Sequence, residues 1–194
     1  MLRLLADRRD ELSRTRAQTL NRLHRLLTEL VPGGAPRHLS VLQAKALLAS
    51  VRPRDAAART RRALAAELIG EIEILDGKLK QLVRRLRQDV VATGSRLLDL
   101  FGIGPAGAAR ILADVGDIAR FADRNRFASW TGTAPLDASS GEQIRHRLSR
   151  AGNRRLNHVL YIAAIVQIRH DTPGRAYYRR KLAEGKTRWR PCAA

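Results

Sequence analysis

The strongest constraint on the fold is a row of apolar side chains that recurs at every third or fourth position between residues 64 and 90. This spacing predicts one long amphipathic helix, because residues three and four apart lie on the same helical face. The row is narrow and flanked by charges, which favours pairing with another helix in a hairpin or coiled coil; a plain bundle helix is the alternative. Thr93, Gly94 and Ser95 are expected to end this helix. The row consists of Leu64, Leu68, Ile72, Leu75, Leu79, Leu82, Leu86 and Val90.

Two further helices are predicted upstream. Leucines at similar spacings predict a helix over residues 2–31, which the Pro- and Gly-rich segment 32–36 stops, and a short helix follows from Ser40 to Ser50. Aromatic residues make up only 4% of the chain. Ala, Leu and Arg, which lose little side-chain freedom in a helix, dominate it. We therefore predict an all-α protein, with a helical linker or coiled-coil-like segment over residues 1–92 and a compact helical domain over residues 93–194.

The chain is strongly basic, with 37 Lys and Arg against 18 Asp and Glu, a formal net charge of +19 and an isoelectric point near 11.6. Nucleic acid is the expected partner, because neutralising phosphates releases condensed counterions. An Arg-rich composition from a GC-rich genome explains part of this excess but not its clustering, and a purely structural helical protein with a basic bias remains an alternative. The sequence has no apolar run of membrane-spanning length and no signal peptide, and its one cysteine, Cys192, fits a reducing cytoplasm.

A glycine-rich turn lies in the segment RLLDLFGIGPAGAARILADVG, residues 96–116. It predicts a short helix, a sharp turn at Gly102 and Gly104, and a second helix that Pro105 opens and that carries Gly107. The free N–H groups at the start of that second helix can bind an anion. The segment resembles the helix-hairpin-helix motif of DNA repair and recombination proteins, which implies contact with the DNA backbone. A tight helical hairpin that only packs is the alternative.

A short helix capped by Asp123 and closed by Gly132 is expected next. Its Phe127 and Trp130, together with Phe121, stand at helical or near-helical spacing. This spacing favours a role as core anchors over a role as platforms for base stacking.

The following segment places two serines beside many arginines. Ser139 and Ser140 precede Gly141 in a polar loop. Guanidinium groups can hold a phosphodiester and offset the charge that develops on it, and a serine hydroxyl attacks phosphorus once a base removes its proton. His146 is one candidate for that base, although a loop serine among phosphate-binding arginines need not be catalytic. The basic residues are Arg145, Arg147, Arg150, Arg154 and Arg155.

Four segments in this order resemble the C-terminal transposase domain of the insertion-sequence one-ten/one-sixteen family: LFGIGPAGAARILADVGDIARF, FASWTGTAPLDASSG, HRLSRAGNRRLNHVLYIAA and TPGRAYYRRKLAEGKT. The upstream segment LLADRRDELSRTRAQTLNRLHRLLTELVPGG is similar to the helical linker of actinobacterial members. The resemblance implies a role in DNA transposition and recombination in the bacterial cytoplasm, at the nucleoid. It also implies a serine nucleophile that precedes a glycine, which is Ser140 here, with Ser139 as the less favoured choice.

The family pattern further implies partners and a cofactor for the full-length enzyme: DNA, a guide RNA, a homo-oligomer formed through the helical segment, and Mg²⁺ held by four acids of a RuvC-like domain. Those acids are expected upstream of Met1, and no metal site or other cofactor is predicted within this chain. The ending RWRPCAA departs from the family after EGKT, as a truncation would. Whether the chain is an enzyme by itself is therefore left open. The alternative is an inactive remnant or a regulatory DNA-binding protein that joins the full-length transposase through its leucine row.

Overall fold

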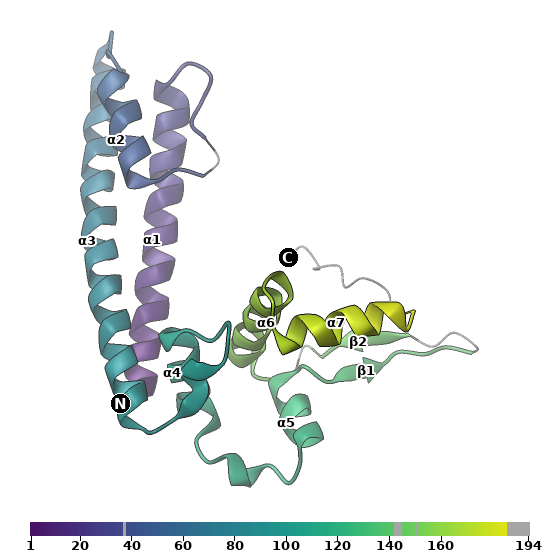
Figure 1. Ribbon diagram of the computed structural model, residues 1–194. Coiled ribbons are helices and arrows are strands. Elements are labelled where there is room, and N and C mark those ends of the chain that lie inside the picture. Colours follow the sequence, from purple (N-terminus) through teal and green to yellow (C-terminus); the bar gives the residue numbers. More distant parts are fainter. Residues whose placement is uncertain (37, 142–144, 150, 186–194) are drawn as a thin grey trace. The chain divides into compact units, whose positions relative to one another are not determined.

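The computed structural model describes residues 1–36, 38–141, 145–149 and 151–185 (Figure 1). It divides into two compact units, one made of Met1 and residues 3–86, the other of Leu2 and the described residues from Arg87 onward. The long helix α3, Ala56–Ala92, runs from the first unit into the second. The domain boundary near residue 93 stays a prediction.

Three helices build the first unit: α1 (Leu2–Leu30), α2 (Val41–Ser50) and the larger part of α3. Ser40 begins α2 with a capping box, in which its hydroxyl accepts from the Gln43 N–H and the Gln43 side chain accepts from the Ser40 N–H. One hydrophobic cluster joins the three helices and the segment before α2. Its buried members are Leu23, Leu27, Leu39, Ala44, Leu48, Ala65, Ile69 and Ile72.

Charged pairs show the direction of α1 relative to α3. The Arg61 Nε lies 2.8 Å from the Glu29 Oε2, and the Arg16 Nη2 lies 3.2 Å from the Asp76 Oδ2. Because Glu29 follows Arg16 while Arg61 precedes Asp76, the two helices run antiparallel, as a helical hairpin does. Hydrogen bonding to Asp76 raises the pKa of Arg16 above its ordinary value.

The predicted apolar row is only partly the buried face of α3. Ile72, Leu86 and Val90 are fully buried, whereas Leu64 is 44% exposed. At that end of the helix Ala65 is buried instead of Leu64. Ala65 belongs to the same cluster as Ala44 of α2, and small side chains allow two helices to approach closely at such a point. Pairing of the coiled-coil type stays a prediction.

In the second unit α6 (Arg154–Arg169) contacts three other helices: α4 (Pro105–Val115), α5 (Arg124–Thr131) and α7 (Pro173–Ala183). Two short 3-10 helices, η1 (Arg96–Asp99) and η2 (Ile118–Arg120), precede α4 and α5. Strands β1 (Pro135–Asp137) and β2 (His146–Leu148) form an antiparallel pair between α5 and α6. Leu156 and Ala163 are the buried residues of α6.

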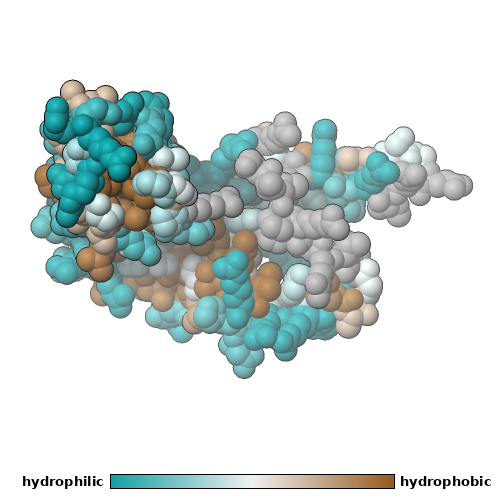
Figure 2. Space-filling model, turned by 90° about the horizontal axis from the view of Figure 1, so that it is seen from above, coloured by the Kyte–Doolittle hydropathy of each residue, from teal (hydrophilic) through white to brown (hydrophobic). Residues whose placement is uncertain are grey.

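The predicted all-α fold class is confirmed, and most helix bounds lie close to the predicted ones, although α3 already begins at Ala56, before the predicted row. Two details differ. The serine loop belongs to a short β-hairpin where a loop alone was expected, and the first element of the glycine turn is a 3-10 helix. No helix among the described residues is both long and apolar enough to cross a membrane. Hydrophilic residues, interrupted by apolar ones, cover much of the face seen in Figure 2.

Candidate nucleic-acid interface

The β1–β2 hairpin carries the predicted serine loop. In its register Leu136 faces Arg147 and Asp137 faces His146. The Ala138 N–H donates to the Arg145 carbonyl oxygen at 2.8 Å, which continues the pairing one step beyond β1. Side chains alternate between the two faces of a strand. Arg145 and Arg147 therefore share one face of the hairpin, and His146 shares the opposite face with Asp137.

The Ser139 side chain braces the neck of this hairpin. Its hydroxyl donates to the Asp137 carboxylate and accepts from the Arg145 N–H at 3.2 Å, and its own N–H donates to the same carboxylate at 2.8 Å. The hydrogen bond from the Ser139 hydroxyl, followed by the one from its N–H, holds the pKa of Asp137 below the ordinary value, and the nearby His146 adds to this effect. The Ser139 hydroxyl is thus already hydrogen-bonded within the hairpin and stabilises its loop.

Ser140, the favoured nucleophile, is exposed. Within the described residues its side chain makes no hydrogen bond, in contrast to Ser139. Arg145 and Arg147 are exposed as well. Arg150 lies outside the described residues. A nucleic-acid strand can therefore reach the serine and both described arginines of the hairpin.

Helix α6 begins directly after the hairpin and carries the remaining predicted arginines. Asn153 caps it by accepting a hydrogen bond from the Leu156 N–H at 3.1 Å. Arg154 and Arg155 occupy its first turn and are exposed. Along the chain, the described arginines thus lie just before β2, within β2 and in the first turn of α6.

The root of the hairpin is held by contacts that the sequence analysis missed. A Cβ added to Gly152 would lie 2.6 Å from the Gly132 nitrogen, so these two backbones touch. The Asn157 Nδ2 donates to the Gly132 carbonyl at 3.0 Å, and the Asn153 Nδ2 donates to Asp114 of α4 at 3.0 Å. The Asn153 N–H donates to the Trp130 carbonyl at 2.8 Å. The sequence Gly152-Asn153 before a helix is typical of a helix cap, which Asn153 forms. The contact of Gly152 with Gly132 could not be predicted, because no sequence pattern links the two glycines.

The glycine turn lies against a different part of α6. A Cβ on Gly102 would meet the Ala163 carbonyl oxygen at 2.9 Å, and one on Gly107 would meet the Val159 Cγ1 at 3.1 Å. Gly104 has open space around it and begins α4 as its N-cap, with Pro105 in the first turn as predicted. Ala163 lies about 13 Å further along the helix than Arg154, at 1.5 Å per residue. The contact of Gly102 with α6 therefore lies away from the arginines in the first turn of that helix, whereas Gly107 contacts α6 nearer to them, at Val159.

An aromatic cluster joins Phe121, just before α5, to Phe127 and Trp130 within it. The ring centroids of Phe121 and Trp130 lie 5.1 Å apart, and those of Phe121 and Phe127 lie 5.3 Å apart. All three rings are half-buried and pack on one another, as anchors do. The Arg120 Cζ stands 4.6 Å from the centroids of both the Phe121 and the Trp130 rings. Asp123 caps α5 and Gly132 closes it, as predicted.

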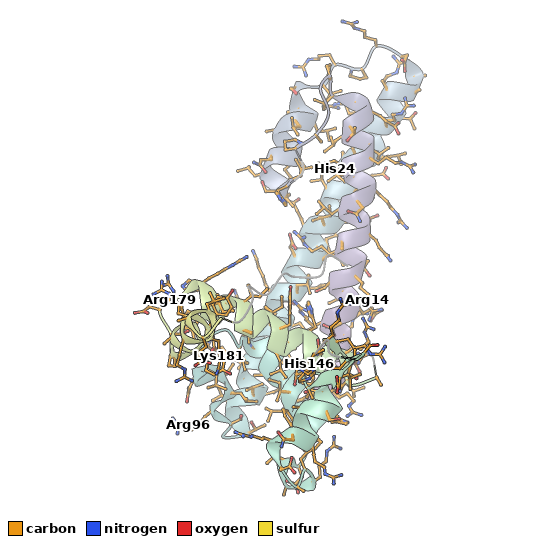
Figure 3. The ribbon with its side chains drawn as sticks, turned by 90° about the vertical axis from the view of Figure 1, so that its right-hand side faces the viewer. Arg14, His24, Arg96, His146, Arg179 and Lys181 are labelled. Carbon is orange, nitrogen blue, oxygen red and sulfur yellow. The ribbon has the colours of Figure 1, made fainter. Side chains whose placement is uncertain are left out.

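Further basic residues extend along α7. Arg179 and Lys181 project from this helix (Figure 3), and the Lys181 Nζ also lies 5.8 Å from the Tyr177 ring.

In the described part of the chain, no group of three or more His, Cys, Asp or Glu side chains is arranged to hold a metal ion.

Residues 94–179 match the family described as Transposase IS116/IS110/IS902 family. Over 231 aligned positions the chain is 29% identical to the insertion element IS116 uncharacterized 44.8 kDa protein of Streptomyces clavuligerus, covering 95% of this chain and 57% of that relative. It is 37% identical over 119 residues to the insertion element IS900 uncharacterized 42 kDa protein of Mycobacterium paratuberculosis, covering 60% of this chain and 28% of the relative. A probable family 20 transposase of Pseudomonas aeruginosa is 32% identical over 106 residues, covering 53% of this chain and 31% of the relative.

Proposed function

This chain carries the transposase domain of the IS116/IS110/IS902 family, and from that premise we propose that it is the DNA-binding part of a transposase whose nucleophile is Ser140. The family acts in DNA transposition. Because the chain spans 57% of the length of the first relative, the activity of the whole protein forms part of this proposal. Mg²⁺, a guide RNA and assembly into a homo-oligomer through the helical segment belong to the same proposal.

The observation that carries the proposal is the exposure of Ser140 in a hairpin whose second strand presents Arg147. Continuing the alternation of Leu136 and Ala138 assigns Ser140 to the face that Arg145 and Arg147 share. A phosphate held by these arginines would therefore meet Ser140. Ser139 is assigned to the other face, with Asp137 and His146, where its hydroxyl is already engaged.

In the proposed step the Ser140 Oγ forms a bond to the phosphorus of a DNA phosphodiester, and the bond from that phosphorus to one deoxyribose oxygen breaks. The Ser140 proton passes to solvent, and the released deoxyribose oxygen takes up a proton to become a hydroxyl. Arg145 and Arg147 would offset the negative charge that gathers on the phosphate oxygens. Arg154, Arg155 and, outside the described residues, Arg150 would hold neighbouring phosphates.

The glycine turn is the second predicted contact with the DNA backbone. Gly104 is the glycine of this turn with open space around it, and it begins a helix whose first N–H groups lack helical acceptors. Gly102 and Gly107 serve this contact indirectly, because their close approach to α6 fixes where the turn lies.

Two measurements test the proposal. DNA binding by the full chain should weaken steeply as salt rises, and an affinity that salt leaves unchanged contradicts phosphate contacts. The second measurement supplies Mg²⁺, element-end DNA and, in trans, the N-terminal domain of a full-length relative. We expect a covalent protein–DNA adduct that Ser140→Ala abolishes. Ser139→Ala, which removes the brace but keeps the proposed nucleophile, should still form the adduct, although more slowly. An adduct that persists in Ser140→Ala refutes the assignment of the nucleophile.

A further inference from the structure

We propose that the segment η2–α5 carries a second phosphate-binding surface, made of Arg120, Arg124 and Arg126 and called the Arg120 patch. It would contact the backbone of the same DNA that the hairpin binds, so the inference rests on the proposed function. None of these three arginines was predicted as a contact from the sequence. The patch lies on α5 and the turn before it, which Figure 1 draws below the strands.

Arg120 is held in place by two aromatic rings. Its Cζ is 4.6 Å from the centroid of the Phe121 ring and 4.6 Å from that of the Trp130 ring. These rings in turn pack against each other and against Phe127. A guanidinium over ring faces gains cation–π attraction and keeps its N–H edge free for hydrogen bonds. Because Arg120 is already ordered, little conformational freedom remains to be lost when it binds a phosphate.

The acidic residues near the patch are engaged with the backbone. Asp123 accepts from the N–H groups of Asn125 at 2.7 Å and Arg126 at 2.8 Å, and Asp117 accepts from the Ala119 N–H at 2.8 Å. Arg120, Arg124 and Arg126 are exposed and form no ion pair within the part of the chain that the structure describes. The three guanidinium groups therefore keep their charge available for an outside anion.

Two of these positive charges, those of Arg124 and Arg126, lie at the N-terminal end of α5, where they destabilise the helix. Arg124 and Arg126 lie in the first turn of α5, where the helix dipole disfavours cations. A bound phosphate would relieve this repulsion and would match the planar fork of each guanidinium. In a chain with a net charge of +19, the phosphodiester backbone of DNA is the polyanion that can offer a phosphate to each of these arginines.

The test uses the full chain and a fluorescently labelled DNA duplex of random sequence. The dissociation constant is measured over a range of salt concentrations, and the slope of log K against log salt is compared between variants. The double variant Arg124→Gln/Arg126→Gln should lower that slope by about 0.9 for each phosphate that is no longer neutralised, so by roughly 2 in total. Arg120→Met keeps much of the packing on the rings and should lower it by about 1.

The matched control removes two exposed arginines from α1, as Arg14→Gln/Arg22→Gln (Arg14 is labelled in Figure 3). It changes the net charge equally and should leave the slope nearly unchanged. The Arg120 patch is refuted if the Arg124/Arg126 variant binds with the wild-type slope, or if the control lowers the slope as much. A wild-type chain without salt-dependent binding refutes the proposed function as well.

Discussion

The substitution Gly102→Ala tests whether the glycine turn is shaped by packing against α6. Gly102 has a φ of +90°, which an L-residue adopts at a cost of about 1–2 kcal/mol. The new Cβ would also stand 2.9 Å from the Ala163 carbonyl oxygen, 3.1 Å from its Cα and 3.3 Å from the Val166 Cβ. Forcing an extra carbon into such a tight space costs about 1–3 kcal/mol more.

The two contributions together predict a loss of about 2–5 kcal/mol from the free energy of unfolding of the second unit. A unit of this size loses about 4 °C in midpoint for each kcal/mol, so we expect a decrease of about 8–20 °C. Gly104→Ser is the matched control. Gly104 has nothing within 4 Å of its Cβ position, and serine is a favoured N-cap residue, so its midpoint should change by no more than about 2 °C.

Thermal unfolding followed by tryptophan fluorescence measures this effect. The chain has two tryptophans, and a Trp189→Phe background leaves Trp130 of α5 to report on the second unit alone. The reasoning is wrong if Gly102→Ala melts within about 2 °C of the parent. A variant that keeps its midpoint and loses only DNA affinity would show that Gly102 contacts DNA and does not pack.

Three further outcomes follow from the contacts around the hairpin. Gly152→Ala should lose about 1–3 kcal/mol in urea unfolding, because its Cβ would lie 2.6 Å from the Gly132 nitrogen; unchanged stability contradicts that contact. Asn153→Asp keeps the helix cap but places a carboxylate against Asp114, so this variant should be less stable in urea unfolding than Asn153→Ser. The reverse order of stability would disprove the Asn153–Asp114 hydrogen bond. The lowered pKa of Asp137 predicts that its interaction with Ser139 is complete above the ordinary pKa of 3.8 and is lost as pH falls through the lower folded value. Carbon NMR should follow the titration of the Asp137 carboxyl. In the Ser139→Ala variant the pKa of Asp137 should rise back toward the ordinary value, and an unchanged pKa would contradict the role of Ser139 as a brace.

The long helices could be predicted from the sequence because their signals are local. The spacing of the leucines predicted α1 and the C-terminal end of α3 closely, although α3 begins at Ala56, well before the predicted row. Asp123 marked a cap, and Ser40 marked the start of a helix, each from its own neighbourhood. The choice of Ala65 over Leu64 as the buried residue could not be predicted, because it depends on where α2 packs.

The candidate site was predicted less completely. Ser140 and its arginines stand out by composition, but strands of three residues each have no periodicity to detect. The contact between Gly132 and Gly152 joins segments that are distant in sequence. The hydrogen bonds of Ser139 with Asp137 and Arg145 could not be predicted, because they form only when the hairpin places Arg145 beside the other two residues. The role of the Arg120 patch likewise depends on how the rings pack.

The touching glycine backbones at the root of the hairpin have an evolutionary consequence. A ladder of three residue pairs is barely stable by itself, so the orientation of the hairpin is set where Gly132 meets Gly152. Insertions or deletions at the far end leave that anchorage intact. We therefore expect that lengthening or shortening the loop at the far end would change the reach of this arm and leave its attachment at Gly132 and Gly152 in place.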